Sequence, residues 1–236
     1  MKKVLLTLVT FVSLIQAQSI YATFNVVAAK KAELAFISSG IVKDVNVDIG
    51  SIVKKGDILA VLGNDDIKAM LESAKTTLKF AKRSLNRQEK IKKLIDEGKF
   101  DKIVSSYEKA KNAVAYQEAL YNKTYLKAPF NGVIYDKNIE RGDAVSAMRL
   151  KAVFKIQSQH ARKLILEFDQ KYNKVVKVGD IFEYKLDGDN TTYRGTIVKI
   201  YPYANFNNRK IRAEVNVKDI IVGLFGDGYI LTKEKE

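Results

Sequence analysis

The stretch GIVKDVNVDIGSIVKKGDILAVL, from Gly40 to Leu62, recurs without a gap as GVIYDKNIERGDAVSAMRLKAVF, from Gly132 to Phe154. Each copy starts with a glycine and an apolar pair and has a second glycine ten residues on. Each ends in Ala-Val before a large apolar residue. Short apolar runs between glycines are typical of β-strands joined by turns. The repeat therefore predicts one β-structured unit made of two matched halves, residues 34–64 and 126–157.

The glycines of the repeat are the expected turn positions of this unit. Glycine adopts positive φ at little steric cost, so it is the usual residue of tight turns. The candidate turn glycines are Gly40, Gly50, Gly56, Gly132 and Gly142.

The segment between the two copies predicts a helical hairpin over residues 65–125. Residues 66–124 contain no proline and only one glycine, Gly98, and apolar residues recur in alternating steps of three and four. This spacing is typical of two helices packed along a seam, and we expect Gly98 to end the first helix. The predicted seam consists of Ile67, Leu71, Ala74, Leu78, Ala81 and Leu85 in the first arm and Ile103, Tyr107, Ala110, Val114, Gln117 and Tyr121 in the second.

The region after the second copy, residues 158–232, predicts a small β-barrel. Strand-like runs at 164–168, 181–184 and 193–200 are separated by turn residues, and we expect the third run to stop at Pro202. Residues 211–217 alternate apolar and polar side chains, which predicts a half-buried strand. The predicted fold class is therefore α+β, mostly β, with a charged tail at 233–236.

The N-terminus predicts export. Lys2 and Lys3 precede an apolar run from Val4 to Ile15, and small residues stand at Ala17 and Ser19, which is typical of a signal peptide over residues 1–19. A retained membrane anchor is the alternative, although the run is shorter than the roughly 20 residues that span a bilayer. The chain has no cysteine, which excludes a lipid-anchored form, disulfides and cysteine catalysis.

Composition and residue spacing argue against a catalytic or metal site. The chain has a single histidine, His160, and no cluster with metal-ligand spacing, so we expect no catalysis, no metal and no cofactor. Lys68 near the junction of the halves leaves open a lipoyl- or biotinyl-type carrier subunit. The net charge of +14 favours acidic partners. It also leaves open a basic envelope or nucleic-acid-binding protein, although export weakens the nucleic-acid interpretation.

Two β halves that each carry Gly–apolar–Gly–x₂–Val and are split by a helical hairpin resemble the periplasmic adaptor, or membrane fusion, proteins of RND/HlyD-type efflux systems. The most specific stretch is APFNGVI, from Ala128 to Ile134, and GSIVKKGDIL, from Gly50 to Leu59, is similarly close. The resemblance covers about residues 34–232. It implies a split lipoyl-like domain, also called a barrel-sandwich hybrid, interrupted by a coiled-coil hairpin and followed by a β-barrel. The family's membrane-proximal domain is expected here only as a vestigial strand within residues 20–33.

The resemblance also implies the partners and the address. Such adaptors bridge an inner-membrane pump, here expected to be of RND type, and a TolC-type outer-membrane channel. They do so as a ring, expected to be a hexamer, that is membrane-proximal but not membrane-spanning, in the periplasm. In many of them the hairpin tip docks on the channel. The corresponding tip residues here are Lys90, Lys93, Leu94, Ile95, Gly98, Phe100 and Ile103.

Overall fold

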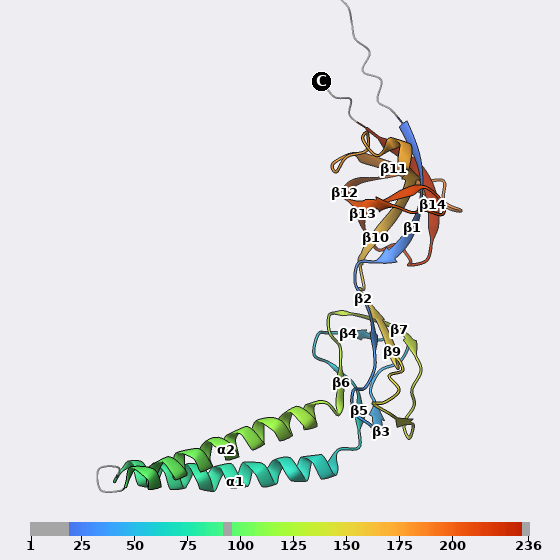
Figure 1. The fold of residues 1–236 in the computed structure, drawn as a ribbon. Helices are drawn as coiled ribbons and strands as arrows, with labels where there is room; N and C mark the ends of the chain where they lie inside the picture. The colour runs from blue at the N-terminus through green and yellow to red at the C-terminus, as the bar shows by residue number, and fades with distance from the viewer. Residues whose placement is uncertain (1–18, 92–95, 233–236) are drawn as a thin grey trace, which may run out of the picture. The chain divides into compact units, whose positions relative to one another are not determined.

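The computed structural model describes residues 19–91 and 96–232, and the chain forms two compact units. One unit comprises Lys31–Gln159, and the other combines the chain up to Lys30 with the chain from His160 onward. The first contains the two repeat halves and the helices, and the second is the barrel (Figure 1). Each unit therefore has its own fold.

The repeat halves form two small sheets of four strands each. One sheet has the order β2-β9-β7-β4 and the other the order β6-β5-β3-β8. The strands of the first sheet are β2 (Lys31–Leu34), β9 (Phe154–Gln157), β7 (Gly132–Lys137) and β4 (Ile52–Val53). Those of the second are β6 (Tyr125–Lys127), β5 (Ile58–Leu62), β3 (Gly40–Val45) and β8 (Ala144–Val145).

The two halves exchange strands, and this exchange follows the sequence repeat. Strand β4 of the first half pairs with β7, and β8 of the second half pairs with β3. Equivalent hydrogen bonds lock both exchanges: the N–H of Gly50 donates to the carbonyl of Ile134 at 2.8 Å, and the N–H of Gly142 donates to that of Val42 at 2.9 Å. The predicted split unit is thus a barrel-sandwich hybrid in which neither half can close alone.

Three of the five candidate glycines occupy turns with positive φ. Gly50, Gly56 and Gly142 have φ of 88°, 94° and 95°. The expectation of turns is wrong for the other two, because Gly40 and Gly132 are the first residues of β3 and β7. Gly132 is nevertheless required, since an added Cβ would lie 2.3 Å from the carbonyl oxygen of Gln157.

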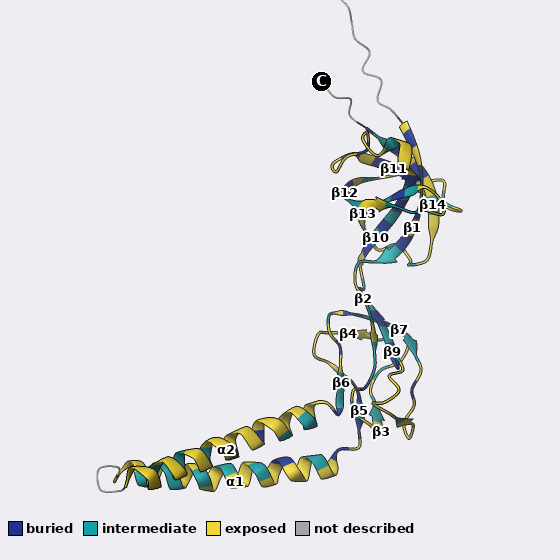
Figure 2. Cartoon of the chain, in the orientation of Figure 1, coloured by how far each residue is buried: buried dark blue, intermediate teal, exposed yellow. Residues whose placement is uncertain are grey.

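The core of this unit lies between the two sheets and draws on both copies of the repeat. Inward-facing residues alternate with exposed ones along the strands (Figure 2). The largest fully buried side chains are Leu59, Leu62, Ile134, Phe154 and Ile156. Burial of both halves in one core explains how the unit tolerates a long insertion between them.

The insertion is an antiparallel pair of helices, α1 (Asp65–Glu89) and α2 (Glu97–Asn122). Their 25 and 26 residues give each arm a length of about 38 Å at 1.5 Å per residue. The expected position of the turn is wrong. Gly98 lies in the first turn of α2 without a positive φ, because Asp96 caps that helix with its carboxylate.

The second unit is a closed barrel with the strand order β1-β10-β13-β12-β11-β14. Its strands are β1 (Ser19–Ala28), β10 (Ala161–Asp169), β11 (Ile181–Leu186), β12 (Tyr193–Ala204), β13 (Lys210–Lys218) and β14 (Phe225–Leu231), with a short 3₁₀ turn, η2 (Gln170–Tyr172), after β10. Aromatic and aliphatic side chains fill its interior, among them Phe24, Phe168 and Phe182.

Strand β1 corrects the expected N-terminal boundary of the barrel. The sequence and its family resemblance predict a separate vestigial strand within residues 20–33 and a barrel that begins at residue 158. In the structure β1 pairs with both β10 and β14 and so closes the barrel. Ile20, Ala22, Phe24 and Val26 are all buried in the core. A barrel built from residues 158–232 alone would lack a strand.

Strand β12 also differs from its expected end, because it runs through Pro202 to Ala204. Pairing with β13 is irregular between Ile200 and Ala204. A proline cannot donate a ladder hydrogen bond and is tolerated in a strand at such irregularities. The proline therefore marks a bulge in this strand rather than its end.

Candidate functional site

The helical hairpin is the candidate functional element, and its seam holds the two arms together. On α1, Leu71 is buried and Leu78 and Leu85 are half-buried; on α2, Val114 is buried and Tyr107 and Tyr121 are half-buried. The neighbouring positions Lys79 and Lys82 are exposed, so each helix presents one apolar stripe to the other (Figure 2).

At the tip, the structure describes only part of the predicted docking segment. Lys93, Leu94 and Ile95 lie outside the described residues. Lys90 is exposed and follows the last residue of α1. On the other arm, the Asp96 carboxylate accepts the backbone N–H of Lys99 at 3.1 Å, and Gly98 is exposed. This cap fixes where α2 begins.

Two of the predicted tip residues are less exposed than a free contact surface requires. Phe100 and Ile103 are half-buried and continue the spacing of the seam towards Tyr107. Ile91, two residues past the end of α1, is 43% exposed. Ile91 is more exposed than Phe100 and Ile103, so it is the better candidate among the described residues for an apolar contact.

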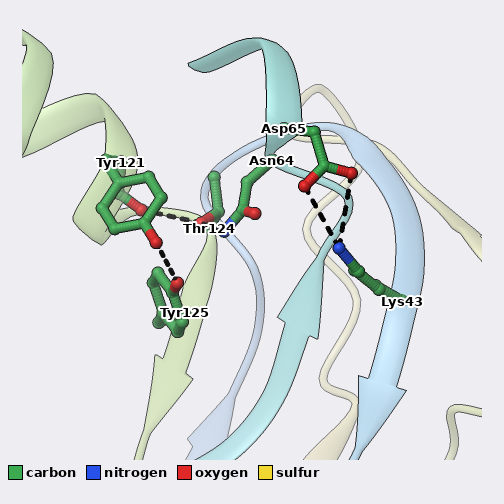
Figure 3. A network of polar contacts seen from close by, with 6 residues as sticks. All are labelled: Lys43, Asn64, Asp65, Tyr121, Thr124 and Tyr125. Atoms are coloured by element: carbon green, nitrogen blue, oxygen red, sulfur yellow. Dashed lines mark hydrogen bonds and ion pairs between the residues drawn. The ribbon is translucent and has the colours of Figure 1, made fainter. Parts of the chain in front are cut away.

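At the opposite end of the hairpin, a buried polar pair joins the two arms to the sandwich (Figure 3). The Asn64 side-chain amide donates to the Thr124 hydroxyl at 2.9 Å, and that hydroxyl donates to the carbonyl of Tyr121 at 2.7 Å. Asn64 precedes α1 and Thr124 follows α2. Asn64 occupies the capping position of α1, but its side chain makes no capping hydrogen bond.

Two further contacts surround this pair (Figure 3). The hydroxyls of Tyr121 and Tyr125 share a hydrogen bond of 2.5 Å. The Lys43 ammonium on β3 lies 3.2 Å from the Asp65 carboxylate at the start of α1. The sequence does not reveal these pairs, because their members lie far apart in the chain or outside any motif. The only sign of the Asn64–Thr124 pair in the sequence is a polar residue at each end of the insertion.

The outward face of α1 is strongly basic. Pairing is sparse along it: Lys75 lies 3.0 Å from Glu72, and the Arg83 guanidinium lies 5.8 Å from the ring centroid of Phe80. The exposed cations of α1 and of the residue that follows it are Lys68, Lys75, Lys79, Lys82, Arg83, Arg87 and Lys90. This face can attract an acidic surface.

The described residues offer no evident site for a metal or a carrier group. No group of three or more His, Asp or Glu side chains within residues 19–91 and 96–232 could hold a metal ion. His160 instead lies 2.6 Å from Asp219. Lys68 is on α1, where its N–H donates to the carbonyl of Asn64, so it is not on a β-turn. Neither described helix is long and apolar enough to cross a membrane.

Comparison with known proteins shows which family has this domain. The CzcB-like barrel-sandwich hybrid domain family matches residues 30–157. The cobalt-zinc-cadmium resistance protein CzcB of Cupriavidus metallidurans is 29% identical over 125 residues, which are 46% of this chain and 24% of that protein. The match therefore spans about a quarter of the length of this relative.

Solved structures share the fold at low sequence identity. A MacA–MexA chimera that contains the α-hairpin domain of Pseudomonas aeruginosa MexA superposes with a TM-score of 0.83 at 18% identity, covering 91% of this chain and 82% of that one. The membrane fusion protein Spr0693 of Streptococcus pneumoniae R6 gives a TM-score of 0.74 at 15% identity, covering 92% and 100%. With the family match over more than half its length, the chain belongs to the CzcB-like barrel-sandwich hybrid family of membrane fusion, or periplasmic adaptor, proteins.

Proposed function

We propose that this chain is the periplasmic adaptor subunit of a tripartite efflux pump and bridges an inner-membrane transporter and an outer-membrane channel. The observation that carries the proposal is the hairpin itself. Two long helices with a basic outer face extend from the sandwich, joined to it by the buried Asn64–Thr124 pair. A projecting hairpin adds nothing to the core of the sandwich, so we infer that its role is to reach a partner.

In this proposal each part has a mechanical role. The hairpin tip contacts the periplasmic end of a TolC-type channel, with Ile91 among the described residues as an apolar contact and Lys90 as a cation that steers the approach. The sandwich and barrel pack against further copies of the chain in a ring, for which we propose a hexamer. An RND-type pump in the inner membrane supplies the energy, and the adaptor itself catalyses no reaction.

The proposed address is the periplasm. A signal peptide over residues 1–19 would direct export, and Ser19 is the first residue of β1. The absence of cysteine from the whole sequence excludes lipid attachment at a cysteine.

The cargo is chosen by the pump in this proposal, and two classes are candidates. Drugs and other toxic organic compounds are one. Divalent metal ions are the other, because the relative with 29% identity is a cobalt-zinc-cadmium resistance protein. A metal cargo would not need ligands on the adaptor.

The test is a deletion strain complemented with the tagged chain. We expect the deletion to raise sensitivity either to a panel of drugs or to zinc, cobalt and cadmium, and expect the tagged chain to co-purify with an inner-membrane transporter and an outer-membrane channel after cross-linking. Unchanged sensitivity to every compound, with neither partner recovered, would contradict the proposal. An added lipoyl or biotinyl mass on Lys68 would instead favour the carrier alternative, and salt-sensitive DNA binding by a chain retained in the cytoplasm would favour the nucleic-acid alternative.

A further inference from the structure

One end of the barrel gathers the first and last described residues of the chain and two connecting segments. Ser19 at the start of β1 pairs with Leu231 at the end of β14, which also pairs with Ile181 at the start of β11. On the other side, Asp169 at the end of β10 pairs with Lys210 at the start of β13. We call this surface the terminal end of the barrel: Ser19, residues 169–180, residues 205–210, and residues 231–232.

Residues 170–180 close the terminal end. The buried side chain of Val176 packs on the barrel core, and the N–H of Gly179 donates to the carbonyl of Ile197 at 2.9 Å. The N–H of Gln170 donates to the carbonyl of Arg209 at 3.0 Å, which ties this segment to the loop between β12 and β13. The surface is therefore a fixed part of the barrel.

This end carries apolar side chains that the fold does not use. Phe206, in the loop between β12 and β13, is 99% exposed, and Val178 is 61% exposed. The loop is held tightly: the N–H of Asn205 donates to the carbonyl of Lys210 at 2.9 Å, and the N–H of Arg209 donates to that of Asn205 at 2.8 Å. A phenylalanine presented to water on an ordered loop has no role in stabilising the barrel.

Basic side chains lie in the same segments as these apolar residues. Five basic side chains lie on the terminal end: Lys171, Lys174, Lys177, Arg209 and Lys210. The same segments contain two carboxylates. That of Asp180 is buried and accepts the N–H of Lys177, and that of Asp169 accepts the N–H of Lys171 and lies 3.9 Å from its ammonium. The terminal end is consequently rich in cations, and its loop between β12 and β13 carries the exposed ring of Phe206.

We propose that the terminal end of the barrel binds an anionic lipid surface, with the ring of Phe206 inserted among the headgroups and the cations of this end set against the phosphates. An exposed aromatic side chain on the same end of the barrel as several lysines and an arginine matches a membrane interface, where amphipathic contacts combine with electrostatic attraction. Charge favours this occupant over an apolar protein groove, because the five cations of the terminal end complement lipid phosphates. The barrel would then hold the adaptor against the inner membrane beside its pump.

The absence of tryptophan from the chain allows a direct test. Phe206→Trp places the only tryptophan of the protein on the terminal end, and Phe80→Trp places it on the exposed face of α1 as a matched control. With vesicles containing phosphatidylglycerol, we expect the tryptophan emission of the Phe206→Trp variant to shift to the blue and to be quenched by brominated lipid. We expect neither effect for the Phe80→Trp variant, nor for the Phe206→Trp variant with vesicles of phosphatidylcholine alone.

Charge variants separate a built site from the general basicity of the chain. In vesicle sedimentation, each cation near an anionic membrane contributes about 1 kcal/mol, so Lys174→Gln combined with Lys177→Gln should weaken binding roughly tenfold or more. Lys79→Gln with Lys82→Gln removes the same charge from the hairpin and should leave binding unchanged. Equal weakening by both pairs, or a Phe206→Trp emission that does not respond to anionic vesicles, would overturn the proposal. An emission shift of the Phe206→Trp variant produced only by a purified pump protein would also overturn it.

Discussion

The side-chain amide of Asn64 donates a hydrogen bond to the hydroxyl of Thr124 at 2.9 Å, and both side chains are buried. Asn64 is the last residue before α1 and Thr124 lies just beyond α2, so this contact closes the base of the hairpin. The same hydroxyl donates to the carbonyl of Tyr121, and the N–H of Leu62 donates to the carbonyl of Thr124 at 2.9 Å. One threonine thus connects the end of α2 to a strand of the sandwich.

Thr124→Val keeps the shape of the side chain and removes the hydroxyl. The buried Asn64 amide then loses its acceptor, and leaving a buried donor unsatisfied costs about 1–3 kcal/mol. We expect a loss of that size in the free energy of unfolding, measured by chemical denaturation with far-UV circular dichroism. Thr76→Val is the control. It removes a hydroxyl that donates to the carbonyl of Glu72 on the exposed face of α1, and it should change stability by less than about 0.5 kcal/mol.

The repeat predicts matched effects at matched glycines. An added Cβ meets nothing within 4 Å at Gly50 or at Gly142, and both residues have positive φ. Gly50→Ala and Gly142→Ala should therefore each cost only the strain of that conformation, about 1–2 kcal/mol. Gly132→Ala should cost clearly more, because its Cβ would collide with the carbonyl of Gln157. Thermal unfolding of the three variants checks the order, and a Gly132→Ala protein as stable as the other two would contradict it.

Leu78 and Lys79 are neighbours on α1 that face different surroundings. Leu78→Asp places a carboxylate between the arms, and an unpaired charge in a packed interface costs at least about 2 kcal/mol. Lys79→Glu changes an exposed side chain and should cost less than about 0.5 kcal/mol. Hydrogen exchange along the hairpin distinguishes local opening of the arms from global unfolding. Equal destabilisation by both variants would show that the register of the seam is wrong.

Local patterns made much of the fold predictable from the sequence. The spacing of glycines and apolar residues marks each half of the sandwich, and steps of three and four mark the seam, because neighbours on a strand or helix are close in the chain. The exchange of β4 and β8 between the halves could not be predicted, since strand pairing across the insertion is not local. The same is true of the Asn64–Thr124 pair.

The two clearest misses have specific causes. Residues 19–28 alternate apolar and polar side chains, with Ile20, Ala22 and Phe24 on one face, which is a legible strand pattern. The sequence-based prediction placed these residues in the signal peptide and in a membrane-proximal segment. They were therefore not counted as a strand of the barrel. Gly98 was interpreted as a helix end, but the carboxylate of Asp96 caps α2 two residues earlier. Capping by a side chain outweighed the conformational preference of a glycine.

Glu214 predicts how the barrel responds to acid. Burial by itself would raise the pKa of this carboxyl, but hydrogen bonds from Lys163 and Tyr201, both 2.7 Å long, outweigh it and lower the pKa. A lowered pKa in the folded state gives stability that is complete above the ordinary value of 4.5 and is lost as the pH falls through the folded-state pKa. We expect Glu214→Gln to flatten the loss of thermal stability below that value, and Tyr201→Phe to flatten it partly. A Glu214→Gln protein with the acid dependence of the wild type would contradict this assignment.

The last prediction concerns docking of the hairpin tip, which carries the proposed function. Ile91→Asp should leave the protein level and the helical content unchanged, because this side chain lies two residues past α1 and is exposed. It should nevertheless abolish efflux, since a charge desolvated in a docking contact costs several kcal/mol. The sequence-based prediction for Leu94→Asp is the same. Met70→Asp introduces the same charge at an exposed position near the base of α1 and should retain efflux. A photo-cross-linking side chain at position 91 should capture the outer-membrane channel, and one at position 70 should not. Full efflux from Ile91→Asp and Leu94→Asp, with no cross-link from position 91, would show that the tip is not where this adaptor meets its channel.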